Sequence, residues 1–211
     1  MVGPDFDTEF RDHLTALFRW RRDVRRFHTT PVDEELLATC LQSIPLAPSV
    51  GLSEPWRVLR ITSDTARTAA LKNFETANAQ ALAGYSGEDA ALYADLKLTG
   101  MREAPIQLAI FCDEDTEQGK GLGAGTMPEM RRYSVVAAIM QFWLSARAQG
   151  LGVGWVSILD APRLTRDLEC PEGWALVAYL CVGYPLEASQ SPELEKAGWE
   201  TRTPDLHIEE R

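Results

Sequence analysis

Five arginines lie within eight residues near the start of the chain, and one carboxylate lies among them. The arginines are Arg19, Arg21, Arg22, Arg25 and Arg26, and the carboxylate is Asp23. A guanidinium group donates paired hydrogen bonds and stays protonated, which suits it to phosphate. Because the whole chain carries a net charge of -10, this local positive charge predicts a phosphate site. The alternative is a solvated, salt-bridged helix end.

Asp23 is the unusual member of the cluster, because a pure phosphate cradle would avoid a carboxylate. Two roles are open for it. It can form an ion pair with Arg19 or Arg26, or it can take a proton as a general base. The sequence shows no arrangement of Ser, His and Asp or of Cys and His typical of a nucleophile. The histidines have no metal-ligand spacing, so no metal site is expected.

The spacing of apolar residues predicts the helices that position this cluster. Residues 7–22 carry an apolar face formed by Phe10, Leu14, Leu17 and Phe18, so the arginines begin at a helix end. Further helices are expected from Glu34 onwards and over residues 64–82, 87–101 and 130–149. The helix over 130–149 is apolar nearly all round, which is typical of a core helix or a subunit interface.

Strands are expected over residues 57–62, 106–112, 152–158 and 175–182. The segment 106–112 is nearly all apolar, as in a strand buried on both faces. Glycines between 119 and 125 predict a mobile loop. The run Gly150-Leu151-Gly152-Val153-Gly154 is not a dinucleotide-binding loop, because a helix precedes it and a strand follows. These glycines instead indicate a tight turn and a close backbone approach to a flat ligand.

Length and composition favour one α+β domain over residues 1–211. Strands and helices do not alternate regularly enough for a doubly wound sheet. The four cysteines are scattered in apolar patterns and predict reduced core residues of a cytoplasmic protein. No signal peptide and no membrane span are expected. The acidic net charge argues against nucleic-acid binding.

Several segments together resemble the nitroreductase-like flavoproteins, and within them the flavin-destroying enzymes that make 5,6-dimethylbenzimidazole. The specific segments are Arg21-Arg22-Asp23-Val24-Arg25 and Gly152-Val153-Gly154-Trp155-Val156-Ser157. The supporting segments are Ala47-Pro48-Ser49-Val50-Gly51, Glu54-Pro55-Trp56, Leu96-Lys97-Leu98 with Ala104-Pro105, and Gly198-Trp199 with Arg202. The resemblance spans about residues 15–205.

The resemblance implies a nitroreductase-like fold with a central, mostly antiparallel or mixed sheet flanked by helices. It also implies a homodimer with a C-terminal arm, about residues 187–211, exchanged between subunits. An arm packed on a partner would explain the isolated Trp199. FMN would bind at two sites built from both subunits.

The resemblance also implies the reaction. Reduced FMN is the substrate, O2 is the co-substrate, and no metal takes part. The products are 5,6-dimethylbenzimidazole, the lower ligand of vitamin B12, and erythrose 4-phosphate. A separate NAD(P)H-flavin reductase would supply reduced FMN. The alternatives are an ordinary FMN-dependent NAD(P)H oxidoreductase, acting on nitroaromatics, quinones or a corrinoid, and a flavin-binding protein without catalysis.

Site residues follow from the same resemblance. Asp23 and Ser157 match the catalytic residues. The phosphate or ribityl end would be held by Arg21, Arg22 and Arg25, with Arg202 from the arm. The remaining flavin contacts would come from Val24, Pro48, Ser49, Val50, Gly51, Leu98, Gly154, Trp155 and Val156. Glu54 departs from the glutamine common in the superfamily, and Arg26-Phe27 differs from some relatives. We expect Glu54 to point away from the flavin or to be paired.

Overall fold

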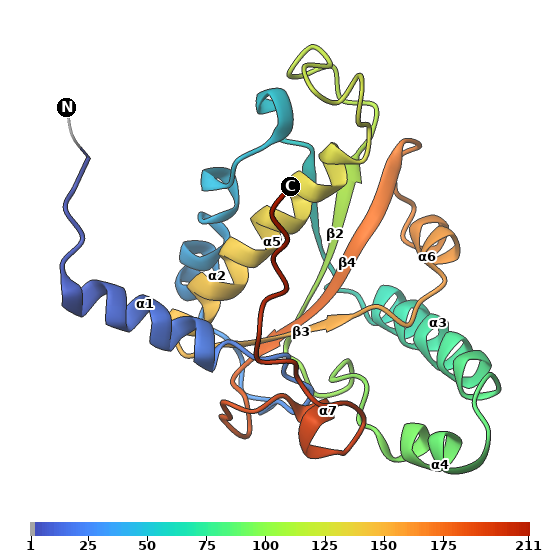
Figure 1. Ribbon diagram of the computed structural model, residues 1–211. Helices are drawn as coiled ribbons and strands as arrows, with labels where there is room; N and C mark the ends of the chain where they lie inside the picture. Colours follow the sequence, from blue (N-terminus) through green and yellow to red (C-terminus); the bar gives the residue numbers. More distant parts are fainter. Residues whose placement is uncertain (1–2) are drawn as a thin grey trace.

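A four-stranded antiparallel sheet forms the centre of the molecule (Figure 1). Its strands are β1 (Trp56–Arg60), β2 (Ile106–Asp113), β3 (Gly152–Val156) and β4 (Trp174–Gly183). Their order in the sheet is β1-β2-β4-β3, and each neighbouring pair is antiparallel. This computed structural model describes residues 3–211. The predicted α+β class and the four expected strands are confirmed.

Helices cover both faces of the sheet and form two apolar layers (Figure 1). One layer contains α5 (Met130–Ala148), α2 (Glu34–Leu41) and the short helix η1 (Ile44–Leu46). The other contains α3 (Asp64–Leu82) and α6 (Ala161–Asp167). β2 lies between the layers and is buried from Ile106 to Cys112, as its continuous apolar run predicted.

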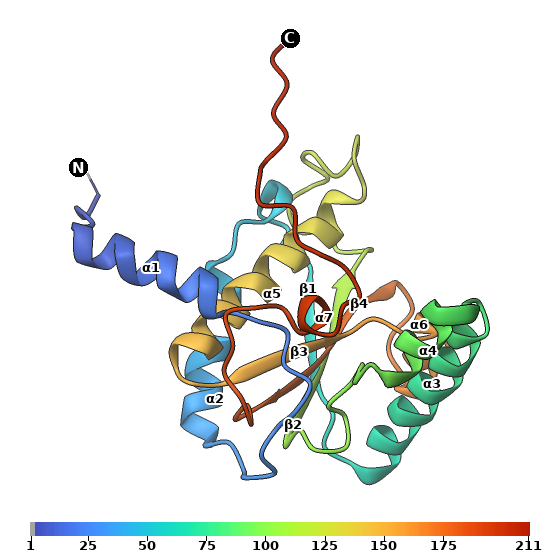
Figure 2. The same cartoon turned by 60° about the horizontal axis from the view of Figure 1, so that its bottom comes forward.

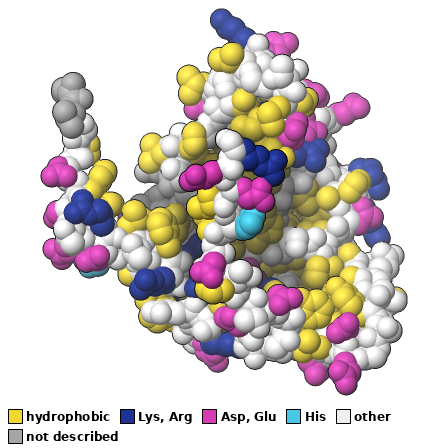
Figure 3. Space-filling view, in the orientation of Figure 1, with side chains coloured by type: hydrophobic (Ala, Val, Ile, Leu, Met, Phe, Trp, Pro, Cys, Tyr) yellow, Lys and Arg dark blue, Asp and Glu magenta, His cyan; other side chains and the backbone are white. Residues whose placement is uncertain are grey.

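α1 (Thr8–Trp20) projects from this body and contacts α5 (Figure 2). Asp7 caps its start by accepting a hydrogen bond from the backbone N–H of Phe10 at 2.8 Å. The predicted apolar face exists, but α1 has no buried residue. An open groove of about 550 Å³ lies between α1 and the end of α5. Figure 3 shows hydrophobic side chains gathered where the two helices meet.

The helix expected over residues 87–101 is shorter in the structure. α4 (Gly87–Asp95) ends before Leu96, and the chain then runs irregularly to Gly100. Gly100 lies so close to Phe27 that a Cβ there would come within 2.4 Å of its ring. The segment therefore packs on the chain that follows α1, and this tertiary contact overrides local helix propensity.

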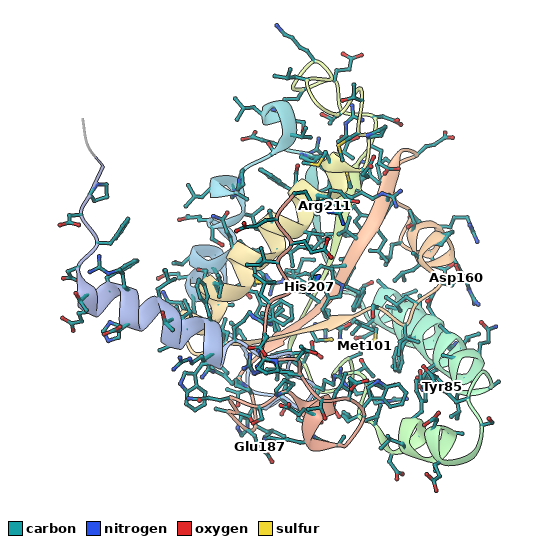
Figure 4. The ribbon with its side chains drawn as sticks, viewed as in Figure 1. Tyr85, Met101, Asp160, Glu187, His207 and Arg211 are labelled. Atoms are coloured by element: carbon teal, nitrogen blue, oxygen red, sulfur yellow. The ribbon has the colours of Figure 1, made fainter. Side chains whose placement is uncertain are left out.

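The C-terminal segment contains one short helix, α7 (Glu193–Lys196). Trp199 follows it and packs edge-on against Tyr85 and Tyr93, 5.5 and 6.1 Å between ring centroids. Tyr85 lies between α3 and α4 (Figure 4). Trp199 thus has aromatic contacts within its own chain and stays half-exposed, and its packing on a partner subunit remains a prediction. Beyond it the tail is exposed, with Leu206 82% and Ile208 74% accessible.

The four cysteines are free thiols, and Cys40, Cys112 and Cys181 are buried, as predicted. Within residues 3–211, His, Cys, Asp and Glu form no group that could hold a metal ion. In the same part of the chain, no helix is long and apolar enough to cross a membrane.

Candidate active site

Arg19 lies in the last turn of α1, and the other four arginines of the cluster lie on the extended chain that leaves α1 and runs beside β3. Arg21 ends the helix with φ -72° and ψ 112°. The N–H of Val24 then donates to the carbonyl of Val153 at 3.0 Å, and Asp23 forms a parallel bridge with Val153. This segment extends the sheet beyond β3, and it places the arginines along its edge.

Asp23 is held at two points. Its Oδ1 accepts from the backbone N–H of Trp155 at 2.8 Å, and its Oδ2 pairs with Nε of Arg25 at 2.7 Å. Arg19 and Arg26 were the ion-pair partners expected from sequence, and both expectations are wrong. In extended chain, residues two apart share a face, so Asp23 meets Arg25. Asp23 remains accessible, with 32% of its side chain exposed.

Gly154 allows this segment to dock. A Cβ at Gly154 would lie 2.1 Å from the carbonyl oxygen of Val24, which no side chain can tolerate. At Gly152 the added Cβ would meet only the side chain of Val24, at 2.8 Å. The close backbone approach predicted for these glycines is real, but the approaching group is the chain at Val24. The predicted tight turn lies at Gly150, which has φ +81°.

Arg25 connects Asp23 to the segment after α4. Its Nη1 donates to the carbonyl of Lys97 at 3.0 Å, and its side chain is only 14% exposed. Leu98, from the same segment, packs against the layer that contains α3. Cys181 of β4 lies near Asp23. Burial raises the pKa of its thiol to about 12, and the charge of Asp23 adds a smaller increase. That thiol therefore stays protonated and adds no charge to the site near neutral pH.

Two other guanidinium groups, of Arg21 and Arg202, lie close enough to Arg22 to repel its charge, and Glu195 offsets part of this repulsion. The pKa of Arg22 is lowered, first by burial and then by the charges of Arg202 and Arg21. Arg22 itself donates from Nε to the carbonyl of Gln190 at 2.7 Å, which ties the C-terminal segment to the cluster. Arg21 lies over the ring of Trp143, 4.9 Å from its centroid. A bound anion would relieve this repulsion, so the residues present fit a phosphate.

A small cavity of about 110 Å³ opens at this cluster. Its lining includes Arg22, Asp23 and Val24, together with residues of the C-terminal segment such as Ser189 and Lys196. The structure thus brings Arg22, Asp23, Val24 and Arg25 together, and it places Arg202 within electrostatic range.

Ser157 directly follows β3, two residues beyond the Trp155 N–H that holds Asp23. Its side chain is exposed, whereas Val156 before it is buried. Trp155 is half-buried and packs against Trp143 at 6.4 Å between ring centroids. In extended chain, two residues span about 7 Å, so Ser157 and Asp23 lie at the same sheet edge.

The segment Pro48 to Gly51 lies elsewhere, at the start of α5 (Figure 1). There the N–H of Val50 donates to Oγ of Ser134 at 3.0 Å. Arg21 instead covers Trp143, nearer the other end of the same helix. At 1.5 Å of rise per residue, Ser134 and Trp143 are separated by about 14 Å along α5. Within one chain, the structure does not bring the two predicted parts of the flavin site together.

The loop that contains Gln118 and Gly119 packs against the segment that begins at Pro48. Gly51 and Gly119 approach so closely that a Cβ at Gly119 would lie 2.6 Å from the carbonyl of Gly51. Nε2 of Gln118 donates to the carbonyl of Leu52 at 2.8 Å and to Oε2 of Glu54 at 3.0 Å. The glycine-rich loop expected to be mobile is thus packed on residues 50–54, and Glu54 is paired as expected.

Ser134 is a positioning residue that the sequence analysis missed. It is 5% exposed, accepts from Val50 and donates to the carbonyl of Met130 at 2.6 Å. We expect Ser134→Ala to lower the free energy of unfolding by about 2 kcal/mol, because it leaves a backbone N–H without an acceptor. Urea unfolding measures this. The control is Thr39→Ala, which removes a similar bond to the carbonyl of Glu35 at an exposed position. Equal losses in both variants would contradict the role.

Comparison with known proteins agrees with this geometry. The model of the Nitroreductase family matches residues 18–184, which include the arginine cluster and all four strands. This chain belongs to the nitroreductase family. Among curated relatives of this nitroreductase-family protein, a 5,6-dimethylbenzimidazole synthase of Rhodospirillum rubrum is 56% identical over 203 residues, covering 96% of each chain. A 5,6-dimethylbenzimidazole synthase of Rhodobacter capsulatus is 44% identical, covering 95% of this chain and 97% of its own.

Solved structures of the family share the fold at lower identity. Iodotyrosine deiodinase bound to FMN and 3-iodo-L-tyrosine superposes with a TM-score of 0.71 at 22% identity, covering 94% of this chain and 97% of its own. A BluB-like flavoprotein from Clostridium difficile gives 0.65 at 19% identity, covering 92% and 94%. The nitroreductase-like fold expected from the sequence is therefore confirmed.

Proposed function

We propose that this protein is a 5,6-dimethylbenzimidazole synthase. It fragments reduced FMN with O2 to 5,6-dimethylbenzimidazole and erythrose 4-phosphate. The observation that carries the proposal is Asp23, a partly exposed carboxylate fixed between Arg25 and the N–H of Trp155 beside a cluster of arginines. Its support from relatives is full-length similarity to proteins with that name.

The chemistry divides between flavin and protein. When bound, reduced FMN supplies the electrons that O2 accepts, and the pyrimidine part of its ring leaves as an oxidised fragment. The protein's residues bind, orient and move protons. Asp23 is an acceptor at both oxygens, and we assign it the removal of a proton at the ribityl carbon that becomes part of the benzimidazole. The hydroxyl of Ser157 donates a hydrogen bond beside the flavin ring.

We assign the phosphate to the arginine cluster and the ring to the β3 edge. Arg21, Arg22 and Arg202 hold the phosphate, because an anion relieves the repulsion that Arg22 experiences from Arg21 and Arg202. Gly154, Trp155 and Val156, with Val24 and Leu98, border the ring or the ribityl chain. Pro48, Ser49, Val50 and Gly51 complete the ring site from a second subunit.

A homodimer accounts for the separation of these parts. The loop from Pro48 to Gly51 and the arginines lie at different ends of α5, so a second copy is needed to bring the loop to the flavin ring beside β3. Exposed apolar side chains on α1 and α5, such as Phe18 and Met140, provide a surface for that copy. The exposed Leu206 and Ile208 suit an arm exchanged between the subunits.

Mixing two inactive variants tests the shared site. Asp23→Asn removes the proposed base, and Gly51→Val disrupts the loop, because any Cβ there would lie 2.7 Å from the carbonyl of Leu122. After denaturation and joint refolding, we expect about a quarter of wild-type activity, since half the dimers are mixed and each has one intact site. A different affinity tag on each variant, with purification over both tags in turn, confirms that mixed dimers form. Mixed dimers without activity would contradict a site built from both subunits.

The product assay tests the function itself. Protein is incubated with chemically reduced FMN in air, and the products are separated by chromatography. We expect 5,6-dimethylbenzimidazole, and its absence across several pH values would overturn the proposal. Under anaerobic conditions NADH or NADPH alone should not bleach bound FMN quickly, because a separate flavin reductase supplies the substrate. Rapid bleaching would favour an NAD(P)H oxidoreductase.

We propose that residues 1–211 act as one flavin-binding domain, with 187–211 as its C-terminal arm. The supporting observation is that Arg22 binds the carbonyl of Gln190 and that Arg26 pairs with Glu193 at 2.5 Å. These contacts join the arm to the arginine cluster.

A further inference from the structure

Arg25 differs from the other arginines of the cluster in what its guanidinium touches. Nε is paired with Oδ2 of Asp23 at 2.7 Å, and Nη1 donates to the carbonyl of Lys97 at 3.0 Å. Its side chain is 14% exposed, whereas that of Arg26 is 50% exposed. Two edges of the guanidinium therefore already form hydrogen bonds within the protein, and little of the group faces solvent.

Both ends of this contact are rigidly placed. On one side, Asp23 is fixed to Trp155, and its backbone is held beside β3 by the bond from Val24 to Val153. On the other side, the chain from Lys97 to Gly100 packs so tightly that a Cβ at Gly100 would lie 3.1 Å from the carbonyl of Arg25. The Arg25 side chain therefore connects Asp23, which is fixed beside β3, to the segment from Lys97 to Gly100.

We infer that Arg25 is a positioning residue for Asp23, which fixes the carboxylate against β3 and does not serve as a ligand of the phosphate. The phosphate then depends on Arg21, Arg22 and Arg202. This inference rests on the proposed function, because it assigns a role within the same site. It replaces the phosphate or ribityl contact expected for Arg25 from the sequence.

Among the ion pairs of residues 3–211, the one that includes Asp23 is formed with Arg25. The other charged groups lining the cavity are Arg22, Arg26, Glu187, Glu193 and Lys196. Arg26 is paired with Glu193, and Arg22 is bonded to Gln190. Without Arg25 the carboxylate would keep one fixed contact, the Trp155 N–H, and could rotate about it. A displacement of about 1 Å in a catalytic group can cost about 10²-fold in rate.

Three variants test the inference: Arg25→Gln, Arg25→Lys and, as the phosphate-side comparison, Arg21→Gln. For Arg25→Gln we expect kcat to fall about 10²-fold with KM for reduced FMN unchanged within about threefold. Arg25→Lys should recover about tenfold of that loss, because an ammonium keeps the charge but cannot make both bonds. Arg21→Gln should instead raise KM.

A readout independent of activity is the amide hydrogen exchange of Trp155. In Arg25→Gln its protection should fall at least tenfold, while the N–H of Val24 keeps its protection and shows that the segment is still docked. A raised KM with unchanged kcat and a protected Trp155 amide would overturn the inference. If the wild-type protein makes no 5,6-dimethylbenzimidazole, the proposed function fails, and the Trp155 amide still decides whether Arg25 holds Asp23.

Discussion

Asp23→Asn is expected to lower the rate of 5,6-dimethylbenzimidazole formation about 10³-fold, with FMN affinity retained. An amide cannot take a proton, but it has the shape of the carboxylate, and its oxygen can still accept from the Trp155 N–H. Two neighbouring groups are unavailable to replace it. Glu193 is paired with Arg26, and the buried thiol of Cys181 stays protonated. Steady-state assays with reduced FMN and fluorescence titration with oxidised FMN measure the two effects.

Asp113→Asn is the matched control for this variant. Asp113 also pairs with an arginine, Arg57, at 2.8 Å and is 19% exposed, but it lies at the far end of β2. Its replacement should leave the rate within about threefold, because the pair that Asp113 forms with Arg57 lies at the opposite end of the sheet from Asp23 and the arginine cluster. An Asp23→Asn enzyme with near wild-type turnover would show that the carboxylate is only structural.

Gly154→Ala is expected to have the second large effect. The added Cβ would lie 2.1 Å from the carbonyl of Val24, so the backbone must move. We expect about 3 kcal/mol of lost stability, which corresponds to a fall in Tm of about 6–12 °C. Activity should fall with it, because the displaced segment carries Asp23. Thermal unfolding and the product assay measure these losses.

Gly152→Ala separates this clash from a general effect of side chains on β3. Its Cβ would meet Cγ2 of Val24 at 2.8 Å and Cβ of Val24 at 3.1 Å, so a shift of a few tenths of an ångström relieves a contact that involves no carbonyl. The loss should be about 1 kcal/mol. A Gly154→Ala protein as stable and active as Gly152→Ala would contradict the docking of Val24 on β3.

Most of the fold could be predicted because its signals are local. The apolar run of β2 and the amphipathic face of α1 are periodicities of neighbouring residues, although α1 ends at Trp20 and not at residue 22 as predicted. The errors arose where tertiary contacts decide. α4 ends early because the chain after it packs on Phe27.

The sequence identified candidate residues for the site, but it did not predict which of them pair with one another. Asp23 and the arginines were conspicuous by type, yet the partner of Asp23 depends on the chain becoming extended after Arg21. Ser134 and Gln118 were missed, because a hydroxyl or an amide that bonds a distant backbone leaves no pattern near itself. Gly154 was noted, but the group that approaches it could be identified only from the structure.

The flavin balance after one oxidation tests the central claim most directly. Protein in excess is mixed anaerobically with reduced FMN, air is admitted, and the FMN that can be recovered is quantified together with 5,6-dimethylbenzimidazole. If the flavin is the substrate, recoverable FMN falls and 5,6-dimethylbenzimidazole appears in equal amount. Quantitative return of oxidised FMN with no 5,6-dimethylbenzimidazole would show a recycled cofactor and would contradict the account.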